Sequence, residues 1–130
     1  MLCGDGTLCT TDVSGQQIGR TVKNQFNLYA DFNGEISNEW GWYARADYIY
    51  RDKSPTRSAN LQFIDDWSVV NARLGLTNDT WDIALWAKNL FDEGYVTSQI
   101  RQPRLNDFVS PTTVIEANLR QVALTVAYRM

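Results

Sequence analysis

Apolar and polar residues alternate along five stretches of this 130-residue chain, each about eleven to thirteen residues long. Because successive side chains of a strand point to opposite faces, this period of two predicts five β-strands, each with one apolar and one polar face. The predicted strands span residues 22–33, 40–51, 67–77, 81–91 and 118–130. In the second of these, the charged side chains of Arg45, Asp47 and Arg51 all fall on one face.

The connections between the predicted strands alternate between short and long. Residues 33–39 and 78–80 are short and rich in turn-forming residues, whereas residues 52–66 and 92–117 are long, polar and contain all three prolines. Short turns therefore lie at one end of the sheet and long loops at the other. This arrangement predicts an all-β fold of antiparallel, up-and-down strands, with residues 1–21 forming a further loop.

Two architectures fit such strands: the wall of a transmembrane β-barrel, and a soluble β-sandwich with its apolar face inward. Length favours the barrel, because a strand that crosses a bilayer needs about nine to eleven residues, whereas typical soluble strands have about five or six. Trp and Tyr near the strand ends also favour it, since these residues gather at membrane interfaces. The predicted membrane-interface aromatics are Trp40, Trp42, Tyr48, Tyr50, Trp67 and Trp81. A small soluble antiparallel β-sandwich that binds a partner or ligand is the alternative.

The charged residues of the predicted strands share the polar face. Such a placement is required if the other face meets hydrocarbon, where an Arg or Lys at the midplane costs about 2 to 4 kcal/mol. In a barrel, the polar face lines the lumen. The predicted lumen-facing residues are Arg45, Asp47, Arg73, Asp82 and Lys88. A soluble sheet gives a similar division of charge, so this feature indicates amphipathic strands more than it indicates lipid.

Composition narrows the function classes. The net charge is -3, so the chain lacks the basic surface that binds nucleic acid. It has no histidine, the commonest general base and metal ligand. Asp65 and Asp66 are adjacent, and on a strand they point to opposite faces, so they do not form a catalytic pair. We therefore predict no enzyme activity, no metal site and no cofactor.

Two cysteines, Cys3 and Cys9, lie in a stretch rich in Gly, Asp and Thr. They can close a short disulfide loop in an oxidising compartment, and two free thiols are the alternative. Residues following Met1 lack the basic and apolar regions of a signal peptide, so export requires sequence upstream. No apolar run is long enough for a transmembrane helix.

The end of the fourth predicted strand carries a short motif. It consists of Asn89, Leu90, Phe91, Asp92 and, three residues later, Tyr95. Together with the preceding residues from 81, this motif resembles the penultimate strand of TonB-dependent outer-membrane receptors, and residues 69–76 resemble the strand before it. Physically, Asn89 and Asp92 can hydrogen-bond nearby backbone where the strand gives way to a loop.

The last predicted strand is apolar at every second position up to the end of the chain. These positions are Val122, Leu124, Val126, Tyr128 and Met130. They resemble the carboxy-terminal signal that the outer-membrane assembly machinery recognises, with Met130 in the place where phenylalanine is usual. Such recognition uses the strand edge for hydrogen bonds and alternate side chains for selection.

The resemblance implies that residues 1–130 are a single partial domain, the last five or so strands of a transmembrane β-barrel in the bacterial outer membrane. It implies that residues 1–21 are an extracellular loop, in which a disulfide is plausible. The complete receptor is expected to take up a siderophore, cobalamin or a similar nutrient. Expected partners are outer-membrane lipid, the rest of the barrel, a plug domain absent from this sequence, the assembly machinery, and TonB through that plug.

Overall fold

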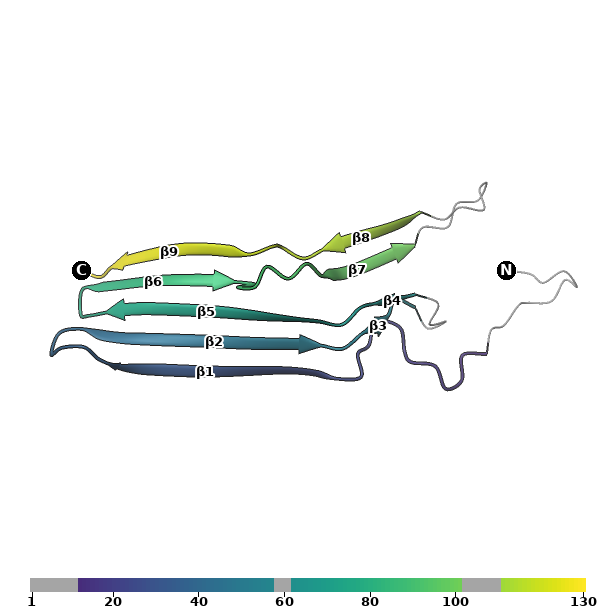
Figure 1. The fold of residues 1–130 in the computed structure, drawn as a ribbon, viewed down its shortest axis with the longest axis horizontal. Helices are drawn as coiled ribbons and strands as arrows, with labels where there is room; N and C mark the ends of the chain where they lie inside the picture. Colours follow the sequence, from purple (N-terminus) through teal and green to yellow (C-terminus); the bar gives the residue numbers. More distant parts are fainter. Residues whose placement is uncertain (1–11, 58–61, 102–110) are drawn as a thin grey trace, which may run out of the picture.

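Five long strands form one antiparallel sheet in the computed structural model, which describes residues 12–57, 62–101 and 111–130. The strands are β1 (Gln25–Glu35), β2 (Gly41–Arg51), β5 (Trp67–Thr77), β6 (Trp81–Lys88) and β9 (Gln121–Tyr128). Their order is β1-β2-β5-β6-β9, so each long strand pairs with the next long strand along the chain (Figure 1). The predicted all-β fold of antiparallel, up-and-down strands is confirmed for the described residues.

The long strands differ in length from the prediction in the second half of the chain. Strands β1, β2 and β5 have 11 residues each, but β6 and β9 have 8. Strand β6 stops at Lys88 because Asn89 takes a left-handed backbone conformation with a φ of 52°, which cannot continue a β-ladder. Strand β9 starts only at Gln121, and the three residues before it form no ladder.

The long connections contain short strands of their own, which the sequence pattern did not predict. Strand β3 (Ser54–Pro55) pairs with β4 (Phe63–Ile64), and β7 (Val96–Arg101) pairs with β8 (Thr112–Glu116). Both pairs lie beyond the same end of the main sheet, and the two short turns lie at the opposite end (Figure 1). We call these two ends the loop rim and the turn rim.

The strand register aligns the two faces across the whole sheet. One row on the apolar face consists of Phe32, Ala44, Leu74, Leu85 and Leu124. The next row consists of Ala30, Ala46, Ala72, Ala87 and Val122. A shift of one residue in any pairing would turn every side chain of that strand to the other face, so the apolar pattern itself fixes the register.

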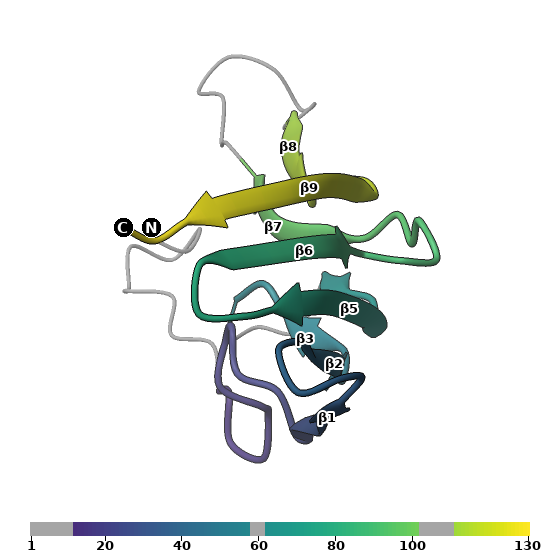
Figure 2. The same ribbon diagram turned by 90° about the vertical axis from the view of Figure 1, so that its left-hand side faces the viewer.

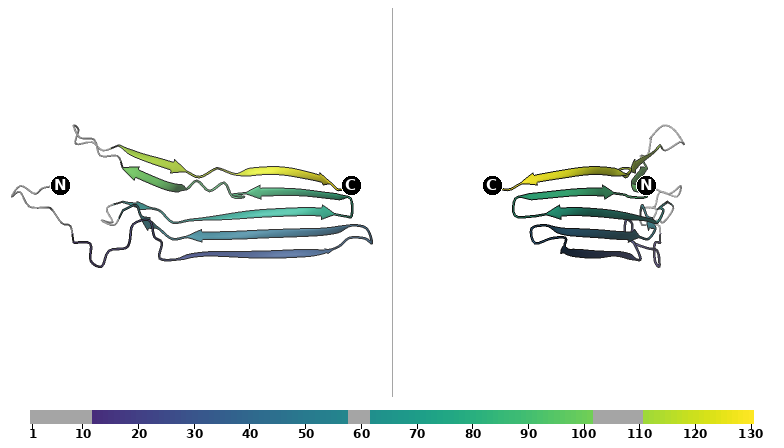
Figure 3. Two further views of the ribbon diagram at one scale, coloured as in Figure 1. Left: turned by 180° about the vertical axis from the view of Figure 1, so that it is seen from behind. Right: turned by 60° about the vertical axis from the view of Figure 1, so that its left-hand side comes forward.

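The main sheet is a single layer, and its apolar side chains are exposed. Phe32 and Leu124 are 61% and 64% exposed. Within the main sheet, the only buried hydrophobic side chains are Val69 and Ala84, and both belong to the polar face. Figures 2 and 3 show the five long strands as one curved layer, without a second sheet stacked on it in the described part of the chain. The apolar face therefore has no packing partner within these residues.

Candidate functional site

Aromatic side chains mark both ends of the apolar face. At the loop rim, the ring of Phe26 stacks on Tyr50 with centroids 5.0 Å apart, and it also approaches Tyr48 at 6.1 Å. At the turn rim, Trp81 meets Tyr128 edge to face at 4.9 Å. Register explains both contacts, because Phe26 pairs directly with Tyr50, and Trp81 pairs directly with Tyr128. Between the two rims the face is aliphatic, apart from Phe32.

Two tryptophans flank the start of β2 at the turn rim. Trp40 closes the turn, since its carbonyl accepts hydrogen bonds from Ile36 and Ser37 at 2.8 and 3.2 Å. Trp42 lies on the apolar face over Gly34, its register partner. A Cβ atom at Gly34 would approach the indole Nε1 to 2.6 Å, so only glycine leaves room for this ring.

Trp67, one of the predicted membrane-interface aromatics, lies at the loop rim but on the polar face. Trp67 pairs in register with Arg51, on the polar face, whereas Tyr48 and Tyr50 lie on the apolar face. Its ring stacks on Tyr95 with centroids 4.2 Å apart and an interplanar angle of 26°. Trp67 shares its parity with Asn71 and Arg73, so the period of two along β5 already assigns it to the polar face.

The predicted lumen-facing residues all lie on the polar face, where four of them belong to two groups. In the first group, the Arg45 guanidinium donates to Asp47 at 2.9 Å and to Asp31 at 3.4 Å, and it lies 5.0 Å from the centre of the Tyr29 ring. Arg45 and Asp31 are nearly half exposed, so solvent screens these pairs strongly.

The second group links strands β2, β5 and β6 through Tyr43 and reaches Arg129, the residue that follows β9. The Tyr43 hydroxyl donates to Asp82 at 3.0 Å and accepts from Arg73 at 3.1 Å. Arg129 approaches the other oxygen of Asp82 at 3.7 Å. The ring of Tyr43 lies against Gly75, its register partner on β5. The hydroxyl is half-buried, and this makes the Tyr43 group better shielded from solvent than the Arg45 group.

Lys88 is the fifth predicted lumen-facing residue, and it stands apart from both groups. Its ammonium lies 5.6 Å from the centre of the Trp86 ring, and the Trp86 indole donates to the Thr125 hydroxyl at 3.2 Å. Lys88 forms no ion pair with any residue in the described ranges. An unneutralised cation therefore remains on the polar face near the loop rim.

Asn89, the first residue of the sequence motif, connects three segments of the chain. It is only 6% exposed. Its side-chain amide donates to the carbonyls of Glu93 at 2.8 Å and Asn118 at 3.3 Å, and its Oδ1 accepts the Glu93 N–H at 2.9 Å. Its own backbone N–H donates to Asn71 Oδ1 at 3.0 Å. This residue joins the end of β6 to β5 and to the start of β9.

Asp92 completes the connection that Asn89 begins, and we call the two residues the Asn89–Asp92 clamp. Asp92 also has a positive φ, of 61°, and its carboxylate accepts the Arg120 N–H at 2.7 Å. Its N–H donates to the Asn89 carbonyl at 2.9 Å. Asn and Asp adopt this left-handed conformation more readily than most residues.

The other motif residues have different surroundings. The Leu90 N–H donates to the Val70 carbonyl at 2.8 Å, Phe91 is 74% exposed, and Tyr95 stacks on Trp67. The sequence suggested that Asn89 and Asp92 bond to nearby backbone, and both do. It gave no signal for Asn71 as a partner, because an Asn on the polar face of a strand is ordinary.

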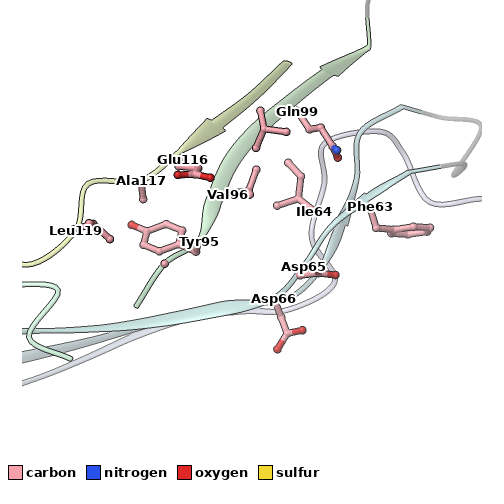
Figure 4. A pocket seen from close by; sticks show the side chains of 12 residues that line it. Phe63, Ile64, Asp65, Asp66, Tyr95, Val96, Gln99, Glu116, Ala117 and Leu119 are labelled. Carbon is pink, nitrogen blue, oxygen red and sulfur yellow. The ribbon is translucent and has the colours of Figure 1, made fainter. Parts of the chain in front are cut away.

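Two hollows flank Tyr95 at the loop rim. The first has a volume of about 360 Å³ and lies between β4 and the β7–β8 hairpin. Figure 4 shows Ile64 and Val96 on facing sides of it, and the carboxylates of Asp65 and Asp66 pointing in different directions. Within the described ranges, no three His, Cys, Asp or Glu side chains are grouped to hold a metal ion.

The second hollow is about 460 Å³ and lies on the polar face of the main sheet. It contains both aromatic side chains of the Trp67–Tyr95 stack, together with Lys88. Residues 116–119, at the end of the β7–β8 hairpin and just after it, contribute the opposite side. The two hollows share Tyr95 and part of this hairpin, so they are neighbours.

Four residues of the predicted carboxy-terminal signal lie on the apolar face of β9. Val122, Leu124, Val126 and Tyr128 pair in register with residues of the apolar face of β6, and each is more than half exposed. Met130 follows β9 and is fully exposed. The other edge of β9 pairs with no strand among the described residues.

The amino-terminal loop meets the loop rim. The Arg20 N–H donates to the Pro55 carbonyl in β3 at 2.6 Å, so residues 12–21 lie beside the long connections. Near its start, hydrogen bonds from the side chain and the backbone N–H of Ser14 lower the pKa of Asp12 below its ordinary value. The predicted Cys3–Cys9 loop falls outside the described residues.

Comparisons with known proteins give no relative for this chain. No protein-family model matches it, and no curated protein or solved structure is significantly similar to it. No helix in the described ranges is long and apolar enough to cross a membrane.

Proposed function

We propose that this chain is part of the wall of an outer-membrane β-barrel of the TonB-dependent receptor class. The observation that carries the proposal is the apolar face, which runs without interruption across five strands in register and stays exposed. Burying one Leu, Val or Phe side chain contributes about 1.5 to 3 kcal/mol, so a face of this kind needs an apolar environment. Lipid tails provide one.

Other features support a bilayer as that environment. Phe26 and Tyr50 lie at one end of the apolar face, and Trp81 and Tyr128 at the other, as in the aromatic girdles of barrels. The polar face, which carries the Arg45 and Tyr43 groups, would then line the lumen and meet the plug domain. A soluble β-sandwich is not supported, because no second layer covers the apolar face within the described part of the chain.

The open edges of the sheet support the proposal that further strands belong to the barrel. Strands β1 and β9 each pair on one side only in the described structure. In lipid, every unpaired backbone group costs several kcal/mol, so only a closed ring of strands is stable. We infer that the complete receptor contains the remaining strands and the plug, takes up a siderophore, cobalamin or a similar nutrient, and receives energy from TonB through the plug.

Vesicle flotation tests the membrane part of the proposal with the full 130-residue chain. Refolded chain should float with phosphatidylcholine vesicles and aggregate in buffer without lipid or detergent. Leu28→Asp, on the apolar face, should reduce flotation at least tenfold. Asn27→Asp is the matched control, because it adds the same charge one residue away on the polar face and should float like the wild type. A soluble monomer that does not float would overturn the proposal and favour the sandwich.

Uptake is tested in the source cells. Deleting the gene that encodes this chain should abolish accumulation of one large nutrient, and a protonophore should abolish the same accumulation in wild-type cells. Accumulation that continues after the protonophore is added would contradict energy transfer through TonB, while leaving the barrel assignment intact.

A further inference from the structure

The hollow beside Lys88 on the polar face offers hydrogen-bonding groups that the protein does not use itself. Asn71 Oδ1 accepts a backbone N–H, but the Asn71 amide N–H groups have no partner in the described structure. The side chains of Gln121 and Asn118 also line this hollow and form no hydrogen bonds with the described residues. An amide side chain both donates and accepts, so it suits a ligand group that also does both.

Charge in this hollow is balanced. Apart from Tyr95, the ionisable residues that line the hollow are one base, Lys88, and one acid, Glu116. Neither forms an ion pair within the described ranges. An anionic ligand would meet Glu116, and a cationic ligand would meet Lys88. The lining therefore favours a ligand with many polar groups and no net charge.

One wall of the hollow is aromatic. Trp67 and Tyr95 stack on each other at 4.2 Å and both line the hollow. Aromatic side chains offer a rigid apolar surface, and the Tyr hydroxyl adds a polar edge. The C–H face of a pyranose ring can pack on such a wall while its hydroxyl groups bond to the amides.

The hollow is held in shape before any ligand binds. Its opposite side is fixed by the Asn89 amide, which donates to the Asn118 carbonyl, and by the Ala117 N–H, which donates to the Tyr95 carbonyl at 2.8 Å. A preformed site loses less conformational entropy on binding. Its volume of about 460 Å³ lies within the usual range of small-molecule sites.

We propose that this hollow, between residues 116–121, the Trp67–Tyr95 stack and Asn71, binds a neutral saccharide. If the barrel assignment holds, the hollow faces the lumen at the loop rim, and the saccharide is a ligand or part of a ligand of the receptor; to that extent the inference rests on the proposed function. The binding chemistry itself depends only on the named side chains.

Glycan binding by the full chain in detergent micelles tests the inference. An array of neutral and anionic oligosaccharides should show retention on neutral members, and titration calorimetry with the best neutral member then gives its Kd. Tyr95→Ala should weaken this binding about tenfold, and Gln121→Ala about three- to tenfold. Tyr29→Ala and Gln25→Ala are the matched controls, since both residues lie on the polar face of β1 outside the hollow.

The outcomes separate this inference from the proposed function. Neutral binding that depends on Tyr95 and Gln121 supports the saccharide site even if the chain fails to float with vesicles. Flotation without retention of any neutral glycan overturns the saccharide site and leaves the barrel assignment standing. Retention of anionic glycans alone, or equal loss with the control variants, also overturns the site.

Discussion

The ring of Tyr43 lies against Gly75, its partner in register on the neighbouring strand, and leaves no room there for a Cβ atom. The contact directs the Tyr43 hydroxyl toward Asp82, one strand further across the sheet. A missing side chain on β5 therefore allows β2 to bond to β6, a strand with which it does not pair. On the apolar face, the ring of Trp42 likewise lies against a glycine of the neighbouring strand, Gly34.

Gly75→Ala should lower the free energy of unfolding by about 1 to 3 kcal/mol, because the new methyl group displaces Tyr43 and separates its hydroxyl from Asp82 and Arg73. Gly41→Ala is the control, since its nearest neighbouring atom would lie at an ordinary 3.5 Å. Urea unfolding in detergent micelles, followed by circular dichroism, measures both variants. Equal stability of the two variants would show that the Tyr43 contact does not constrain the sheet.

Asn89→Ala should destabilise the junction between β6 and β9 by about 1 to 3 kcal/mol, because it leaves the part-buried Glu93 N–H and the Asn118 carbonyl without their partner. Amide hydrogen exchange should become faster at Glu93, whose N–H loses its acceptor. Asn27→Ala, on an exposed position of β1, should change neither quantity. Unchanged exchange at Glu93 would mean that the clamp is not needed to hold this junction.

Tryptophans on the two faces should respond differently to lipid. In variants that keep one tryptophan each, bromine-labelled acyl chains should quench Trp42 and Trp81 more strongly than Trp67 and Trp86, which lie on the polar face. The comparison uses the fluorescence ratio with and without brominated lipid. Equal quenching of all four would contradict a bilayer on the apolar side.

The Arg45 group should matter little for stability despite its short distances. Asp47→Asn should lower the free energy of unfolding by less than about 1 kcal/mol, since exposed ion pairs are screened by solvent and salt. Unfolding at low and at high ionic strength measures the effect, which should shrink as salt is added. A loss above about 2 kcal/mol that persists in high salt would mean that solvent and salt do not screen this ion pair, although its side chains are exposed.

Much of the sheet could be predicted because the signal is local. A period of two places Leu28, Ala46 and Leu124 on one face whatever lies next to them. The presence of each long strand, and the face to which each of its side chains points, therefore followed from sequence alone. The same period assigns Trp67 to the polar face, but it gives no sign of the stacking partner Tyr95, which lies in another segment.

The candidate site depends on contacts that no local pattern contains. Asn71 and Asn118 meet Asn89 only because β5, β6 and β9 are neighbours, and their separation in sequence gives no hint of this. The β7–β8 hairpin was likewise hidden, since its residues alternate less regularly and a bulge between Val96 and Ser98 interrupts the pairing.

Because the main sheet has five strands, its outermost strands β1 and β9 both run from the loop rim to the turn rim. If identical copies of this sheet were joined edge to edge in one orientation, β9 of one copy would lie beside β1 of the next, and the two strands would run parallel. A ring in which every neighbour is antiparallel needs an even number of strands. In the proposed barrel, the segment that completes the ring between β9 and β1 must therefore supply an odd number of strands, beginning and ending with a strand that runs the opposite way.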